Sequence, residues 1–157
     1  MKQTVKVDVG GKRGYKLRTK IDNRDFVSII REYVIEDDGV TFLTETYLDN
    51  EASVKISFAS ESIYRVQMFP FCRTDVRQNP VFDFPAFKEF QVHEDELFIY
   101  ICTSRLELSI RKCPWEISVK LDGRPLTGEH IKDFNVGQRY KAMPLGFEYD
   151  VDTKEVR

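Results

Sequence analysis

A chain of 157 residues accommodates one domain and leaves little room for two. With 41% hydrophobic and 32% charged residues it is not a disordered chain, and no apolar run approaches the roughly 18 residues that span a bilayer. The 24 Lys and Arg residues nearly balance the 26 Asp and Glu residues, whereas a dedicated nucleic-acid-binding domain is strongly basic. We therefore expect neither a nucleic acid nor a membrane as partner.

The first residues and the cysteines indicate the compartment. Met1 to Val5 is too polar to begin a secretory signal peptide. Cys72, Cys102 and Cys113 form no C-x-x-C pair, and such a sparse, odd set is typical of reduced thiols. We expect a cytoplasmic protein with free, buried or half-buried cysteines.

The first third of the chain predicts a turn and then strands. Gly10–Gly11 predicts a hairpin turn before the strand-like alternation of residues 15–17. Apolar residues in 27–35 fit helical spacing as well as a strand, but β-branched residues crowd the segment. Asp37–Gly39 follows as a turn. We therefore interpret 27–35 as a strand.

The next segments alternate between apolar and polar residues. Strands are predicted over 40–47, 52–58 and 63–68. In the second of these, Val54, Ile56 and Phe58 share one face while polar residues occupy the other. Two-faced strands of this kind are typical of an antiparallel sheet with one packed side.

A long irregular stretch, residues 69–90, separates these strands from a second set. It contains Pro70, Pro80 and Pro85, which withhold backbone donors from a sheet, and five phenylalanines. Loops longer than about 15 residues are uncommon in compact domains and are often functional. Its aromatic side chains either pack the loop onto the domain or line a sugar site.

The second set of strands forms a predicted meander. Alternating apolar residues mark 97–101, 106–110 and 115–121, and Asp122–Gly123 is a strong turn signal. Trp115 lies on the apolar side of its strand, so we expect it in the core. The whole pattern predicts a single all-β domain over residues 1–157, an antiparallel β-sandwich with little helix.

The end of the chain is less regular. Residues 145–151 predict a further strand, and the last residues indicate a turn with another strand just beginning. We therefore expect the natural polypeptide to continue past Arg157.

No catalytic or metal-binding constellation is visible. His93 and His130 are the only histidines, and His93–Glu96 is interpreted as a solvated inter-strand turn without zinc-ligand spacing. Nearly all acidic residues fall in turns or opposite the apolar faces of strands, and no G-x-S-x-G motif is present. We expect no catalytic residue, metal or cofactor in this chain.

Three segments carry a family resemblance. The strand at 63–68, the pair of segments 102–110 and 114–117, and Leu121–Leu126 occur in an order similar to that of the N-terminal domain of glycoside hydrolase family 31, the α-glucosidase and α-xylosidase family. The likeness covers roughly residues 40–157, and its motifs are strand patterns and not catalytic signatures.

The resemblance implies a galactose-mutarotase-like β-sandwich that packs on the catalytic (β/α)₈ barrel of the same polypeptide. The catalytic aspartates of that family lie in the barrel, so no catalytic residue is assigned here. A loop of this domain would wall the pocket for an oligo- or disaccharide substrate. Phe82, Phe84 and Phe87 of the 69–90 loop are the candidates for this wall.

Two other functions fit the same sequence. A free-standing carbohydrate-binding module also uses a sandwich with aromatic side chains, usually exposed Trp or Tyr. A protein-interaction sandwich fits the composition equally well. The accessory-domain interpretation differs from both because it predicts a large exposed apolar patch where the barrel packs.

Overall fold

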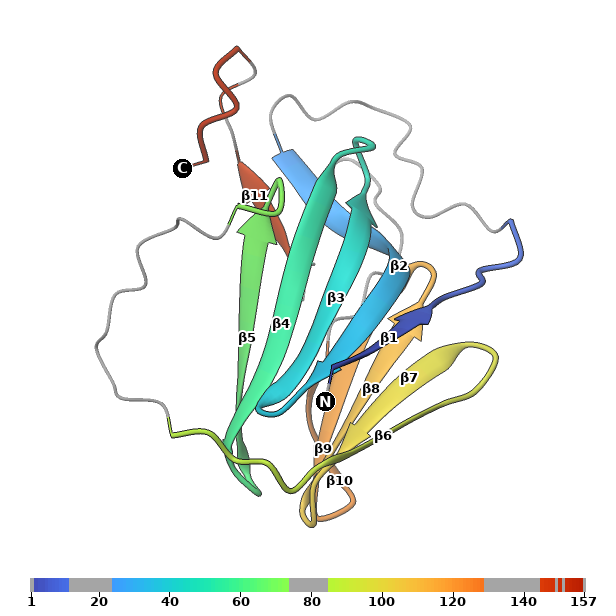
Figure 1. Cartoon of the computed structure of the whole chain (residues 1–157), viewed down its shortest axis with the longest axis vertical. Coiled ribbons are helices and arrows are strands. Elements are labelled where there is room, and N and C mark those ends of the chain that lie inside the picture. Colours follow the sequence, from blue (N-terminus) through green and yellow to red (C-terminus); the bar gives the residue numbers. More distant parts are fainter. Residues whose placement is uncertain are drawn as a thin grey trace.

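The computed structural model describes residues 2–11, 24–73, 85–128, 145–148, 150 and 152–156. Within these residues there is no helix, and every strand pair is antiparallel. The strands form two sheets that face each other as the layers of a sandwich (Figure 1). The predicted all-β antiparallel sandwich is thus confirmed.

The first sheet is a meander with one added strand. Its strands follow one another along the chain in the order β1-β2-β3-β4-β5, and β11 pairs with the beginning of β2. Their bounds are β1 Gln3–Lys6, β2 Arg24–Glu36, β3 Gly39–Thr46, β4 Glu51–Ser60, β5 Ile63–Pro70 and β11 Gly146–Glu148.

The second sheet is also a meander, with the order β10-β9-β8-β7-β6. It extends the three predicted strands by one strand on each side. The bounds are β6 Gln91–Glu94, β7 Phe98–Cys102, β8 Leu106–Lys112, β9 Trp115–Leu121 and β10 Arg124–Gly128.

The core lies between the two sheets and is built from their alternating inward side chains. Val54, Ile56 and Phe58 of β4 are fully buried, as the sequence pattern predicts. Trp115 of β9 is also fully buried, which confirms its core position, and it meets Phe42 of β3 from the opposite sheet. Burial of such large rings is the main stabilising contribution to a sandwich.

Segment 27–35, which also fits helical spacing, lies within β2. Its β-branched side chains favour a pleated surface, and the Asp37–Asp38 turn returns the chain so that Ile35 pairs with Val40. Gly39 begins β3 beside β4, where a Cβ atom would lie 2.0 Å from the carbonyl oxygen of Ile56. Only glycine fits this close approach.

The turn at Gly10–Gly11 is present, with φ values of +59° and +69°. Its predicted hairpin partner, residues 15–17, lies outside the described residues. The strand before the turn, β1, pairs with the far end of β2, and Val5 lies opposite Tyr33. The two-glycine signal thus identifies the turn, and the partner of β1 that the structure describes is a segment distant in the sequence.

Three predicted boundaries are corrected. Strand β5 continues through Phe69 to Pro70, so the long connection begins at residue 71 and not at 69. His93 lies within strand β6 and not in a turn, and the turn is formed by the residues after Glu94. Leu97 lies in this turn, with 40% of its surface exposed, instead of continuing the inward face of β7.

The chain ends outside the meanders. Within the described part of the predicted strand 145–151, Gly146–Glu148 pairs with residues 24–26 of β2. No described helix is long and apolar enough to cross a membrane.

Candidate functional site

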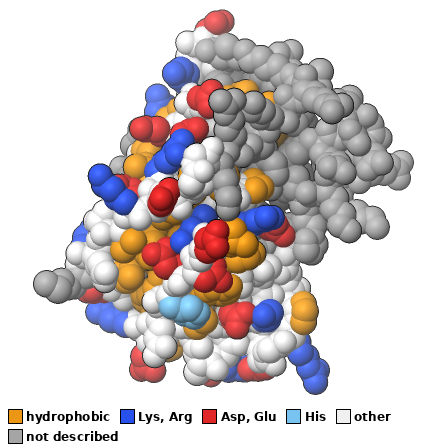
Figure 2. All heavy atoms as spheres, turned by 90° about the vertical axis from the view of Figure 1, so that its right-hand side faces the viewer, with side chains coloured by type: hydrophobic (Ala, Val, Ile, Leu, Met, Phe, Trp, Pro, Cys, Tyr) orange, Lys and Arg blue, Asp and Glu red, His pale blue; other side chains and the backbone are white. Residues whose placement is uncertain are grey.

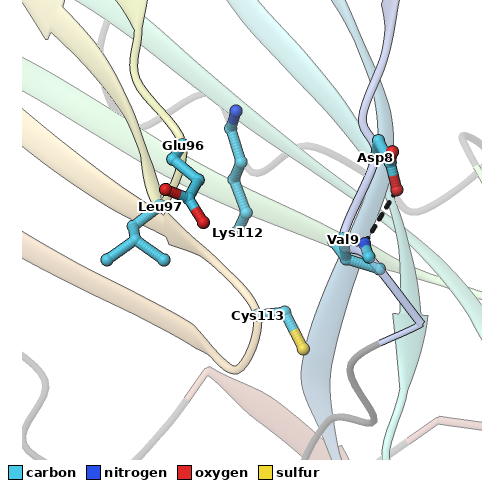
Figure 3. A pocket seen from close by; sticks show the side chains of 7 residues that line it. Asp8, Val9, Glu96, Leu97, Lys112 and Cys113 are labelled. Carbon is cyan, nitrogen blue, oxygen red and sulfur yellow. Dashed lines mark hydrogen bonds between the residues drawn. The ribbon is translucent and has the colours of Figure 1, made fainter.

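A pocket of about 380 Å³ lies between the chain that follows β1 and two turns of the second sheet. Asp8, Val9 and Gly10 line one side, and Glu96 with Leu97 lines the other (Figure 3). Lys112 and Cys113, at the turn from β8 to β9, complete the described lining. The pocket therefore lies where the chain after β1, from the first sheet, approaches the β6–β7 and β8–β9 turns of the second sheet.

Lys112 is the only buried Lys or Arg side chain among the described residues, with 8% of its surface exposed. Its Nζ donates to the carbonyl oxygen of Asp95 at 2.7 Å and lies 2.8 Å from Oε2 of Glu94. A buried ammonium needs such partners, because desolvation of an unpaired charge is costly. Two of its three N–H groups are thus used by the protein.

Asp95 organises the turn beside this pocket. Its carboxylate accepts hydrogen bonds from the backbone N–H groups of Phe98 and Leu97 and from the hydroxyl of Tyr100. These donors, with Phe98 first, lower the pKa of Asp95, and the same carboxylate raises the pKa of Tyr100. The turn and the Tyr100 ring are therefore fixed to each other.

The described pocket residues supply binding groups without a catalytic arrangement. Cys113 is buried, and no described histidine lines the pocket as a base. No group of three or more potential metal ligands occurs among the described residues. The described lining presents two carboxylates, an ammonium group and the apolar side chains of Val9 and Leu97.

All three cysteines are free, as the sequence predicts. Cys113 is buried, and Cys72 and Cys102 are half-buried. Burial raises the pKa of both half-buried thiols, with the charges of Glu51 and Glu107 adding to the effect at Cys72 and Cys102. A raised pKa leaves little nucleophilic thiolate, so neither cysteine is an activated nucleophile.

Of the predicted sugar-wall residues, Phe82 and Phe84 lie outside the described residues. Phe87 is half-buried, packs against the core, and donates its backbone N–H to the carbonyl oxygen of Phe58 at 2.9 Å. Phe90 stacks on Phe58, with ring centroids 5.4 Å apart. The described part of the loop thus packs onto the sandwich, and Phe87 does not line the pocket between β1 and the second sheet.

One buried acid departs from the expected solvation positions. Asp25 is fully buried and accepts hydrogen bonds from the Thr46 hydroxyl at 2.5 Å and the Asn50 side-chain amide at 2.9 Å. The backbone N–H groups of Phe26 and Leu48 also donate to it. Asp25 therefore ties the start of β2 to the turn between β3 and β4, a structural role.

The exposed large hydrophobic side chains are scattered over the described part of the molecule. Ile63 lies on β5, Leu97 in the β6–β7 turn, Leu126 on β10 and Val156 near the C-terminus. On the side shown in Figure 2, acidic and basic side chains lie between the hydrophobic areas. These four residues, each on a different segment, do not by themselves form the large apolar patch expected of a barrel-packing domain.

No protein-family profile and no curated protein matches this sequence. Solved structures with the same fold do exist. One is a cycloalternan-forming enzyme from Listeria monocytogenes in complex with a pentasaccharide substrate, with a TM-score of 0.59 and 19% identity. Another is an uncharacterized protein of Listeria monocytogenes EGD-e in complex with α-D-glucose, β-D-glucose, magnesium and calcium, also with a TM-score of 0.59 and 19% identity.

Each alignment covers 68% of this chain and 10% of the Listeria chain. The chain therefore corresponds to about one tenth of the proteins that it matches. At this identity the likeness establishes the sandwich fold.

Proposed function

We propose that this chain is a non-catalytic sandwich domain of an α-glucosidase-like glycoside hydrolase, which packs on a catalytic barrel of the same polypeptide and helps to shape its sugar pocket. The observation that carries the proposal is the match of this fold to one tenth of a much longer enzyme that has a pentasaccharide substrate. A fold shared with a small part of a large enzyme suits an accessory role.

Two further observations support the proposal. The two buried charged residues of the described chain, Asp25 and Lys112, both hold structural partners. The segments that resemble family 31, at 63–68, 102–110, 114–117 and 121–126, lie in β5 and in the meander from β7 to β10. Both agree with a domain whose catalytic aspartates reside elsewhere.

The coding sequence beyond codon 157 provides the direct test. We expect the reading frame to continue through a glycine-rich segment into a (β/α)₈ barrel that carries carboxylate catalytic residues. A frame that ends at or near Arg157 would overturn the proposal. In that case a free-standing carbohydrate-binding module becomes the leading function.

The contribution to the sugar pocket is tested in the full-length enzyme. Replacement of Phe82 and Phe84 by Ala should change the KM for oligosaccharides and the preferred chain length. Ile63→Ala is the matched control, since Ile63 is 55% exposed on β5. If KM and chain-length preference are unchanged in the Phe82 and Phe84 variant, the loop does not contribute to the sugar pocket.

A further inference from the structure

An aromatic pair stands on the outer face of the second sheet, away from the core. His93 on β6 and Tyr100 on β7 are cross-strand partners, and their rings stack 4.8 Å apart at an interplanar angle of 14°. The neighbours of Tyr100 along β7, Ile99 and Ile101, are fully buried, so the Tyr100 side chain points outward. The sequence pattern assigns no role to this pair.

The Tyr100 ring is held in place before any ligand arrives. Its hydroxyl donates to Oδ2 of Asp95 at 2.9 Å, and Asp95 is itself fixed by the N–H groups of Leu97 and Phe98. His93 covers one face of the ring. A preorganised side chain loses little conformational entropy on binding, which favours affinity.

Along β7 the Phe98 ring lies beside Tyr100, with centroids 6.0 Å apart, whereas the residues aligned with Tyr100 across the sheet are small. The strand register aligns Tyr100 with Ser109 on β8, Ser118 on β9 and Gly128 on β10. A Cβ atom on Gly128 would lie 3.5 Å from Cβ of Ser118, so both positions face the same side. Ser109 and Ser118 are partly exposed, and no hydrogen bond of their hydroxyls occurs within the described part of the chain.

Two ion pairs border this row of small residues. Lys120 lies 2.7 Å from Glu107 on one side, and Arg111 lies 3.7 Å from Glu116 on the other. Each pair consists of cross-strand neighbours on β8 and β9. The charges cancel within each pair, and the Asp95 carboxylate beside Tyr100 is already engaged by three donors. The surface therefore suits a neutral ligand that exchanges many hydrogen bonds and presents one apolar face.

We propose that this surface, defined by His93, Tyr100, Ser109 and Ser118, binds a pyranose ring of a neutral carbohydrate. The C–H face of the sugar stacks on Tyr100, and its hydroxyls bond to the two serines and to the bordering ion pairs. Aromatic stacking with hydrogen bonding around it is the chemistry that a neutral sugar requires and that a charged or apolar ligand does not. The inference rests on the geometry of this sheet face alone and goes beyond the proposed function, which concerns a barrel-facing pocket.

The test is a titration of the ¹⁵N-labelled 157-residue chain, followed by amide chemical shifts. The probes are glucose, galactose, mannose, xylose and N-acetylglucosamine, each as the free sugar and as short linear oligosaccharides. We expect saturable shifts centred on Tyr100, Ser109 and Ser118 for at least one probe, with a Kd of about 10 mM or tighter.

Variants test whether binding depends on stacking against the Tyr100 ring or only on the sheet being folded. Tyr100→Ala should weaken binding about tenfold, whereas Tyr100→Phe, which retains the ring, should remain within about threefold. Ser118→Leu keeps the aromatic pair but fills the space beside it, and should also lose at least about tenfold. Gln67→Leu, on the outer face of the first sheet, is the control and should bind as the unmodified chain does.

Three results would overturn the proposal. One is the absence of shifts with every probe up to about 50 mM. Another is a set of shifts confined to the pocket between β1 and the second sheet, or to the first sheet. The third is a shift of these signals with protein concentration in the absence of sugar, which would make the surface an interface between copies of this chain.

Discussion

The rings of Phe42 and Trp115 meet edge to face across the sandwich, with centroids 5.7 Å apart and an interplanar angle of 81°. Phe42 belongs to β3 and Trp115 to β9, so this contact joins the two sheets at the centre of the core. Both side chains are fully buried. Edge-to-face pairs stabilise by about 0.5–1.5 kcal/mol beyond the area that they bury.

Trp115→Ala should lower the free energy of unfolding by about 3–5 kcal/mol, because it removes the ring contact and leaves a cavity. Urea unfolding followed by circular dichroism measures this loss. Leu126→Ala is the control, since Leu126 is 55% exposed on β10 and should change stability by less than about 0.5 kcal/mol. Equal losses in the two variants would contradict the central position of Trp115.

Asp25→Ala should destabilise the domain by about 2–4 kcal/mol, because a buried donor on Thr46 and half-buried donors on Leu48 and Asn50 lose their acceptor. Asp25→Asn should also be destabilising, since its amide N–H₂ group would face donors that need acceptors. Chemical unfolding of both variants checks the prediction. If the Asp25→Asn variant is as stable as the unmodified protein, the prediction is wrong. The single side-chain oxygen of Asn would then be a sufficient acceptor for the surrounding N–H and O–H groups.

Gly39→Ala should cost at least about 2 kcal/mol, because the new methyl group would lie 2.0 Å from the carbonyl oxygen of Ile56 and the two strands would have to separate. Gly128→Ala is the matched control, since its nearest contact of 3.5 Å is ordinary packing. Thermal unfolding compares the two. Similar melting temperatures for both variants would show that β3 tolerates the displacement.

The carboxyl of Asp95 should titrate below its ordinary pKa of about 3.9, because Phe98, Leu97 and Tyr100 donate to its charged form. A pKa that is lower in the folded state stabilises the fold above the unfolded-state pKa, and this contribution is lost as the pH falls through the folded-state value. A ¹³C-detected titration of the carboxyl group measures the midpoint.

Tyr100→Phe provides the internal check on that titration. Removal of the hydroxyl donor should raise the pKa of Asp95 toward its ordinary value without restoring it fully, because the two backbone donors remain. In the unmodified protein, Tyr100 should itself titrate above about 10, since ionisation would place its phenolate beside Asp95. If the pKa of Asp95 is unchanged in the Tyr100→Phe variant, the Tyr100 hydroxyl does not contribute to lowering that pKa.

The sequence predicts the meanders because their strands and turns are specified by residues that are close together in the chain. Alternation of Val54, Ile56 and Phe58 determines which side of β4 is buried, and Asp122–Gly123 gives the turn between β9 and β10. Strand β6 is missed because only Val92 among its residues packs against the core, so no alternation is visible. The partner of β1 is missed because the pairing depends on a segment more than twenty residues away.

The site residues are harder to predict for a related reason. Asp25 stands just before an apolar run, where an acid is normally solvated, and its burial depends on Thr46 and Asn50 in a distant turn. The row from Tyr100 to Ser109 and Ser118 exists only once the register of three strands is set. A one-residue slip would place these side chains in the core, so spacing in the sequence alone does not reveal the row.

The order of the strands also has a practical consequence. Every strand from β1 to β5 is encoded before residue 74, and every strand of the second sheet after residue 84. Strand β11, at the end of the chain, nevertheless completes the edge of the first sheet. Separately expressed fragments cut between these residues would each carry one meander and would share an interface made of the whole core and of β11. We expect them to reassemble on mixing, as the two halves of a split reporter do.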